Sequence, residues 1–170
     1  MKIEGFICHF YKANKNGEIV TPESFARALA DYKEKGLYPA LTYNHEKGNV
    51  IGKIQDIIVK ADGLYMIAEL NEEVKEVQDR ILPLVKDGTL KCFSTEGYVA
   101  QSSIENYEDG TYLAKDFYLT AVSIVPVPAD FDSQFTINGI NIDPYHIIYV
   151  DVADEPRSQS PKPIRLSVIL

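Results

Sequence analysis

The sequence is poor in the residues that several protein classes depend on. It contains two cysteines, three histidines and no tryptophan among 170 residues. Two cysteines are too few for a disulfide framework. The histidines His9, His45 and His146 are scattered and show none of the His-x-x-x-His or Cys-x-x-Cys spacings that hold zinc. Both glycine-rich phosphate-binding patterns are absent as well, which disfavours nucleotide chemistry. We therefore expect neither a metal nor a cofactor.

Charge and hydropathy exclude two further classes. The net charge of -8 argues against binding to a nucleic-acid backbone, which requires lysine and arginine. No apolar run approaches the ~18 residues of a membrane span, so no membrane association is expected. Residues 1–5 lack the apolar stretch of a signal peptide, which favours a cytoplasmic location.

Composition along the chain predicts one compact domain followed by a tail. The length suits a single domain with a hydrophobic core of its own. We place that domain at residues 1–152. Residues 153–170 are polar and rich in proline and have no periodicity, which is typical of a flexible C-terminal tail.

Alternating apolar residues and turn signals predict an α+β, mainly β, protein. Turns are expected at 14–17, where asparagine and glycine tolerate positive φ, and at 61–63. A short strand or loop is expected at 131–142. The predicted strands are Lys2–Tyr11, Leu41–Asn44, Val50–Lys60, Leu64–Leu70, Leu90–Ala100, Tyr112–Val125 and Ile147–Val152.

Two helices are expected between the strands. The first has Thr21 as its N-cap and Gly36 as its C-terminal stop. The second follows Asn71, and Pro83 is expected to end or kink it near Leu82. Helical spacing assigns the buried faces to Phe25, Ala28, Leu29 and Tyr32 in the first helix, and to Val74, Val77 and Ile81 in the second.

Three polar residues could form a hydrolytic site, which needs a nucleophile, a base and a group that orients the base. His45 is the candidate base and Ser94 the candidate nucleophile. Asp116 could accept a hydrogen bond from the histidine. Strand alternation puts Cys92 and Glu96 on the same face as Ser94, so Cys92 is a second possible nucleophile. The alternative interpretation is a strand face turned to solvent.

Five segments in a fixed order resemble the prohead (procapsid) maturation proteases of tailed phages, which are relatives of the herpesvirus assemblin proteases. The resemblance runs from about Lys2 to about Ala129. The segments are 14–20 with the helix after it, 39–45 with Val50-Ile51-Gly52-Lys53, 62–64, 86–94 and 119–129.

The resemblance implies a closed or nearly closed antiparallel β-barrel of the herpesvirus-protease type, with about two flanking helices. It implies a serine endopeptidase that cleaves scaffold and capsid protein segments, and itself, during procapsid maturation. In this family His45 would be the base and Ser94 the nucleophile. Phage scaffold and major capsid proteins would be the substrates, inside an assembling procapsid in the host-cell cytoplasm. A homo-oligomer is compatible with the herpesvirus relatives, which act as dimers.

The oxyanion hole, by the same resemblance, uses backbone N–H groups after the last strand. Pro126 and Pro128 have no N–H, so Val127 or Ala129 would supply it.

The third catalytic member is open, because the family often has glutamate where this chain has Ala121. Asp116 is the first choice, since sliding the strand against the herpesvirus pattern puts it where those enzymes carry a second histidine. Glu96 and Asn16 are the alternatives.

Two other functions stay in view. Ala121 supports an inactive, scaffold-associated structural protein with the same fold. A thiol hydrolase would use Cys92 with His45.

Overall fold

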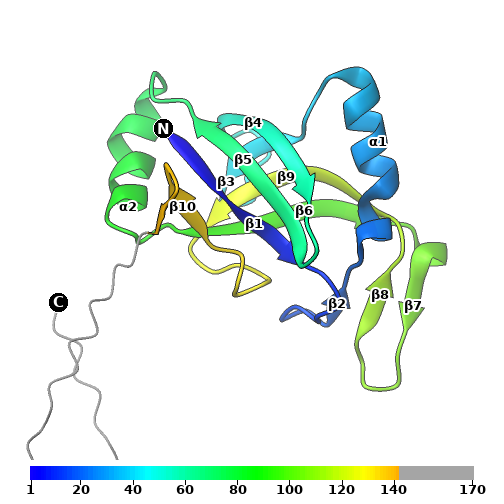
Figure 1. Ribbon diagram of the computed structural model, residues 1–170. Coiled ribbons are helices and arrows are strands. Elements are labelled where there is room, and N and C mark those ends of the chain that lie inside the picture. Colours follow the sequence, from blue (N-terminus) through cyan, green and yellow to red (C-terminus); the bar gives the residue numbers. More distant parts are fainter. Residues whose placement is uncertain (142–170) are drawn as a thin grey trace, which may run out of the picture.

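A computed structural model describes residues 1–141 of the chain (Figure 1). The strand expected at 147–152, the domain boundary at 152, the tail at 153–170 and His146 lie outside the described residues. Among residues 1–141, no helix is long and apolar enough to span a membrane.

One curled sheet of eight strands dominates the fold (Figure 1). Its strand order is β11-β10-β1-β5-β4-β3-β9-β6. Neighbouring strands are antiparallel except for β3 and β9, which run parallel. The bounds are β1 Lys2–His9, β3 Ala40–Tyr43, β4 Val50–Val59, β5 Gly63–Leu70, β6 Cys92–Val99, β9 Phe117–Val125, β10 Phe135–Ile137 and β11 Ile140–Asn141.

The two ends of this sheet approach each other. Cys92, at the start of β6, forms an antiparallel bridge with Gln134, just before β10. Next to it, the Phe93 N–H donates to the Ser133 carbonyl (2.8 Å), and the Phe135 N–H donates to the Lys91 carbonyl (2.9 Å). The sheet is therefore a nearly closed barrel, as expected for an architecture that hides its strand edges.

A second, three-stranded sheet was not predicted. It projects from the barrel and consists of β2 Glu18–Ile19, β7 Ile104–Asn106 and β8 Tyr112–Ala114 (Figure 1). The short 3-10 helix η3 Gln101–Ser103 leads into β7. The single strand predicted at 112–125 is thus wrong: β8 and β9 belong to different sheets. The strand is interrupted at Lys115 and Asp116, where the Lys115 N–H donates to the Ser103 carbonyl (2.8 Å).

The first helix forms as predicted, as η1 Pro22–Phe25 followed by α1 Ala26–Lys35. Thr21 and Ser24 form a capping box at its start, and Gly36 ends it in the left-handed conformation (φ 62°). The Phe25 ring packs on Phe117 of β9 with 5.3 Å between ring centroids, which fixes the helix against the barrel.

Of the two outcomes expected at Pro83, an end or a kink near Leu82, the second helix does not end there: it changes from a π-helical to an α-helical segment at Leu82 and continues. It comprises the π-helical η2 Val77–Ile81 and then α2 Leu82–Lys86. The Leu82 N–H bonds to the Val77 carbonyl, five residues back. This wider turn accommodates Pro83, which has no N–H, within the first turn of α2.

The barrel interior holds one apolar cluster to which β1, β3, β4, β5, β6 and β9 all contribute. Burial of each large aliphatic or aromatic side chain contributes about 1.5–3 kcal/mol. Because these strands also carry the polar residues discussed below, core packing sets the positions of those residues. The fully buried members include Ile3, Leu41, Leu64, Met66, Phe93, Leu119, Val122 and Ile124.

Gly97 sits at a β-bulge between β6 and β9 and has no room for a side chain. A Cβ there would lie 2.3 Å from the Phe117 ring and 2.4 Å from the Tyr118 carbonyl oxygen. Gly97→Ala should lower the free energy of unfolding by about 1–3 kcal/mol, measured by urea denaturation. The matched control is Gly48→Ala, where a Cβ meets no atom within 4 Å and a change below about 0.5 kcal/mol is expected. Equal effects of the two substitutions would contradict this packing.

Candidate active site

A hollow of about 510 Å³ brings together residues that lie far apart in the sequence. It is bounded by the turn after β1, the loop after β3, the middle of β6 and the segment after β9. Its lining contains both the predicted base and the predicted nucleophile. The lining residues are Asn14, Lys15, Asn16, Glu18, His45, Ser94, Thr95, Glu96, Gly97, Phe117, Val127 and Ala129.

Ser94 lies on β6 directly opposite Ser123 of β9. The residue is only 6% exposed, and its neighbour Phe93 is fully buried in the core. A solvent-facing strand surface is therefore not the environment of Ser94. The serine is held on a rigid strand at the wall of the hollow, where the core fixes its position.

His45 follows β3 in a strained backbone conformation. Its φ is 61°, and that of Asn44 is 52°, both in the left-handed region that non-glycine residues rarely adopt. Two hydrogen bonds hold the turn against β9. The Asn44 N–H donates to the Ile124 carbonyl (3.0 Å), and the His45 N–H donates to the Ser123 hydroxyl (3.1 Å).

Glu96 is the carboxylate that meets the histidine ring. Its Oε1 lies 3.1 Å from Nδ1 of His45. The same oxygen accepts hydrogen bonds from the hydroxyls of Ser123 (2.7 Å) and Thr42 (3.2 Å). This contact favours the tautomer with hydrogen on Nδ1, which leaves Nε2 as the basic nitrogen.

The environment keeps the Glu96 carboxyl ionised. Partial burial alone would raise the pKa of Glu96. Hydrogen bonds from the Ser123 hydroxyl, the His45 ring and the Thr42 hydroxyl outweigh that effect, so the pKa of Glu96 is lowered from its ordinary value. The site therefore contains a histidine beside an ionised carboxylate.

Two buried hydroxyls of this site had no role in the prediction. Ser123 is fully buried and Thr42 is 1% exposed, and their oxygens lie 2.5 Å apart. Ser123 was visible only as part of a family motif, and Thr42 as a residue of the segment before His45. Buried hydroxyls on adjacent strands would have been the signal, but they required the pairing of β3 with β9 to be known.

Asp116 lies outside the hollow. Its carboxylate receives a bidentate interaction from Arg27 of α1, with Nε 3.1 Å from both oxygens and an Nη2 contact at 3.0 Å. It lies seven positions before Ser123, which is about 23 Å along an extended strand. The structure therefore does not bring Asp116 to His45 and Ser94.

Asn16, the other alternative for the third member, lines the hollow within the predicted turn. Its N–H donates to the Asn14 side-chain oxygen (2.9 Å), and Gly17 has a φ of 79°. Within residues 1–141 the structure shows no contact between Asn16 and the histidine ring.

The side chains of Ser94 and His45 share the hollow, but no direct hydrogen bond joins them within the described part of the chain. Such bonds are commonly long in resting enzymes and shorten when substrate binds. Proton transfer between them would require the serine hydroxyl and the histidine ring to come within hydrogen-bond reach when substrate binds.

Cys92 is a poor nucleophile in this setting. It is 6% exposed, and burial raises the pKa of its thiol. A thiol with a raised pKa is less often ionised at neutral pH, and the thiolate is the reactive form. Among the described residues, no three histidine, cysteine or acidic side chains are grouped so that they could hold a metal ion.

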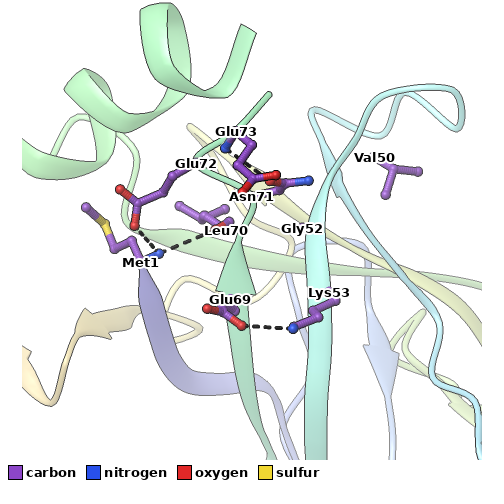
Figure 2. Close-up of a pocket in the computed structure, with 9 residues that line it drawn as sticks. All are labelled: Met1, Val50, Gly52, Lys53, Glu69, Leu70, Asn71, Glu72 and Glu73. Carbon is purple, nitrogen blue, oxygen red and sulfur yellow. Dashed lines mark hydrogen bonds and ion pairs between the residues drawn. The ribbon is translucent and has the colours of Figure 1, made fainter. Parts of the chain in front are cut away.

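Another hollow, of about 490 Å³, lies near the chain start and the end of β5 (Figure 2). Its lining includes the ion pair of Lys53 with Glu69 (3.1 Å). The lining contains no serine, cysteine or histidine, so it offers none of the nucleophiles considered above. The residues are Met1, Val50, Gly52, Lys53, Glu69, Leu70, Asn71, Glu72 and Glu73.

Comparison with solved structures shows which class of fold this is. The capsid assembly protease of bacteriophage T4 superposes with a TM-score of 0.60 over 73% of this chain and 80% of its own, at 17% identity. The KSHV protease, solved with a hexapeptide phosphonate inhibitor, gives 0.51 over 79% and 63%, at 11% identity. The chain therefore has the fold of the herpesvirus-type proteases, as predicted.

The sequence itself carries the family assignment. The model of the caudovirus prohead serine proteases matches residues 1–146, and the chain belongs to this family. The prohead protease of Escherichia phage T5 is 29% identical over 139 residues, which cover 81% of this chain. The chain spans 62% of the length of that relative.

The lowered pKa of Glu96 makes its contribution to stability dependent on pH. A carboxyl whose folded pKa is lowered stabilises the protein above the ordinary value of 4.5, and this is lost as pH falls through the folded pKa. At pH 7, Glu96→Gln should lower the free energy of unfolding by about 1–3 kcal/mol, because it weakens hydrogen bonds to a charged group.

The measurement is urea unfolding of both proteins from pH 7 down to pH 3, where the difference should shrink. Glu46→Gln, on the exposed loop beside His45, is the control and should change stability little at either pH. A difference that stays constant across this range would contradict the assignment of an ionised, hydrogen-bonded Glu96.

Proposed function

We propose that the protein is a serine endopeptidase that cleaves scaffold and capsid protein segments, and itself, during maturation of a phage procapsid. The observation that carries this proposal is the contact of His45 with Glu96 in the hollow that Ser94 also lines. Membership of the prohead serine protease family supports the same chemistry.

In the proposed mechanism, Nε2 of His45 takes the proton from the Ser94 hydroxyl as the serine oxygen attacks the carbonyl carbon of the peptide bond. Glu96 holds the histidine ring and stabilises its positive charge. His45 then returns the proton to the departing amine, and an acyl-enzyme remains on Ser94. Water, activated by the same histidine, hydrolyses the ester and regenerates the serine.

The oxyanion that forms during this attack would be held by backbone N–H groups of the segment after β9. Val127 and Ala129 both line the hollow, and each has an N–H, unlike Pro126 and Pro128. Removing one donor from such a site typically costs about 10²–10³-fold in rate.

Glu96, the alternative to Asp116, is proposed as the third catalytic member. The argument rests on register as well as on contact. Related prohead proteases often have glutamate at the position of Ala121, and Glu96 is the direct cross-strand partner of Ala121. Cross-strand partners share a face of the sheet. A carboxylate moved from β9 to β6 in this way would still face the histidine.

The substrates follow from this assignment. Scaffold and major capsid proteins would meet the protease inside the assembling procapsid, within the host cell. A homo-oligomer remains a prediction, as does trimming of the chain by its own activity.

Ser94→Ala should abolish processing of the phage's own scaffold–capsid assembly, a loss of at least about 10³-fold. Cys92→Ser, two residues away on the same strand face, should retain activity. Gel analysis of the assembly over time measures both. A fluorophosphonate probe should label the wild-type protein at Ser94 and leave Ser94→Ala unlabelled. A wild-type protein that neither cleaves nor reacts would instead favour the inactive structural protein.

Glu96→Gln should reduce the cleavage rate by about 10²–10⁴-fold, because a neutral amide holds the histidine less well and does not stabilise its charge. Asp116→Asn should stay within about twofold of wild type, since its contact with Arg27 is a partly exposed surface pair. The reverse ranking of these two variants would restore Asp116 to the site and exclude Glu96.

Moving the carboxylate across the strand pair tests the register itself. Glu96→Ala should be inactive. The double variant Glu96→Ala with Ala121→Glu should cleave at least about tenfold faster than Glu96→Ala alone, because the two positions face each other. Ala121→Glu alone, in the presence of Glu96, is the control for steric damage. A double variant no better than Glu96→Ala would argue against the equivalence of the two positions.

A further inference from the structure

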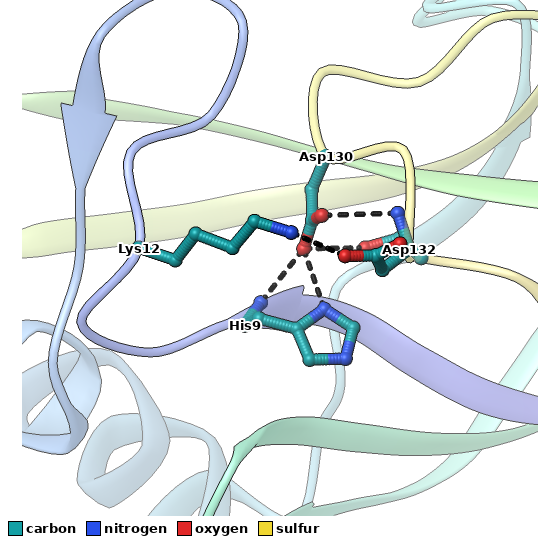
Figure 3. Close-up of polar contacts among 5 residues, drawn as sticks. His9, Lys12, Asp130 and Asp132 are labelled. Carbon is teal, nitrogen blue, oxygen red and sulfur yellow. Dashed lines mark hydrogen bonds and ion pairs between the residues drawn. The ribbon is translucent and has the colours of Figure 1, made fainter.

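A second histidine–carboxylate pair lies outside the hollow, at the end of β1 (Figure 3). Asp130 Oδ2 accepts hydrogen bonds from the backbone N–H of His9 (2.9 Å) and from the Ser133 hydroxyl (3.1 Å). The Nδ1 atom of His9 lies 2.7 Å from the same oxygen. The other oxygen, Oδ1, accepts the Asp132 N–H (3.1 Å). One carboxylate thus engages four groups.

This carboxylate is sheltered and stays charged. The Asp130 side chain is 13% exposed and that of His9 is 21% exposed. Burial would raise the pKa of Asp130, but the donors from His9, Asp132 and Ser133 together hold that pKa below its ordinary value. The charged carboxylate of Asp130 therefore interacts mainly with other groups of the protein and little with solvent.

The pair of His9 and Asp130 is connected both to the segment after β9 and to the strand that carries Ser94. Asp130 follows Ala129 directly, so it anchors the segment proposed to hold the oxyanion. The carbonyl of Ser133, whose side chain donates to Asp130, accepts the N–H of Phe93 (2.8 Å), the residue just before Ser94. The nucleophile strand and the oxyanion segment are thus tied to one carboxylate.

The backbone segment after β9 has few hydrogen bonds available to fix its position. Pro126 and Pro128 cannot donate hydrogen bonds, so the ladder of β9 cannot continue through them. The Ala129 carbonyl accepts the Lys15 N–H (3.0 Å), which ties the segment on one side. Asp130 supplies the attachment on the other side, to the end of β1.

We propose that His9 and Asp130 are positioning residues, which hold the Val127–Ala129 segment at the distance from Ser94 that oxyanion stabilisation requires. The proposal rests on the proposed serine endopeptidase function. It assigns neither residue a contact with substrate. Its expected signature is a loss in the chemical step without a loss in substrate binding, because an oxyanion exists only after attack.

Asp130→Asn removes the charged acceptor and should lower kcat by about 10–100-fold while KM changes by less than about twofold. The measurement is steady-state cleavage of the purified scaffold protein, with rates normalised to folded protein. The matched control is Asp132→Asn in the same loop. Asp132 is 59% exposed and pairs with Lys12 at the surface, so both constants should stay within about twofold of wild type.

Rescue at His9 separates positioning from general damage. His9→Ala keeps the backbone N–H bond to Asp130 but loses the side-chain donor, and should lower kcat by about tenfold or more. His9→Asn places an amide donor near the position of Nδ1 and should recover most of that loss. Thermal unfolding of both variants checks that they are folded at the assay temperature.

The outcomes distinguish this proposal from the function on which it rests. If Ser94→Ala cleaves as well as wild type, the proposed function fails. If Ser94→Ala is inactive but His9→Ala and Asp130→Asn retain wild-type kcat, only the positioning role is overturned. A rise in KM with unchanged kcat would overturn it too, and so would a His9→Asn variant no better than His9→Ala.

Discussion

The register of β6 against β9 is the constraint on which the candidate site depends. It places Ser94 opposite Ser123 and Glu96 opposite Ala121. A slip of one residue would turn each of these side chains to the other face of the sheet. The core prevents that slip, because Phe93 and Val122 alternate with the polar residues and are fully buried. Packing of the apolar side chains in the core therefore fixes the positions of the polar side chains on the opposite face of the same strands.

The buried hydroxyls extend this control to the histidine. Ser123 accepts a hydrogen bond from the His45 N–H and donates one to the Glu96 carboxylate. One hydroxyl therefore positions both the His45 backbone and the carboxylate that contacts the His45 ring. A buried hydroxyl without partners would cost about 1–3 kcal/mol. Here the partners are supplied, and the same bonds hold His45 in a left-handed conformation that is unfavourable by itself. The backbone strain at His45 is thus offset by its hydrogen bonds to β9.

Elements with local signals were predictable, and elements decided by distant contacts were not. The helix from Pro22 to Lys35 was predicted because its cap, its spacing and its stop all lie within 16 residues. The break at Asp116 was not, since β-branched and aromatic residues continue on both sides of it and no turn signal marks the change of sheet. Asp116 was placed at the head of one long strand for that reason, whereas the fold turns there toward Arg27.

The sequence by itself determined the kind of chemistry to look for. Few cysteines, scattered histidines and a set of ordered motifs led to a prohead protease with Ser94 and His45 as candidates, since residue types and order are properties of the chain. Only the tertiary structure decided which carboxylate meets the histidine. Glu96 and His45 are 51 positions apart, and their contact exists because β3 and β6 flank β9 in the curled sheet. Such a neighbour relation depends on strand order and register, which the core sets through packing among residues distant in the chain.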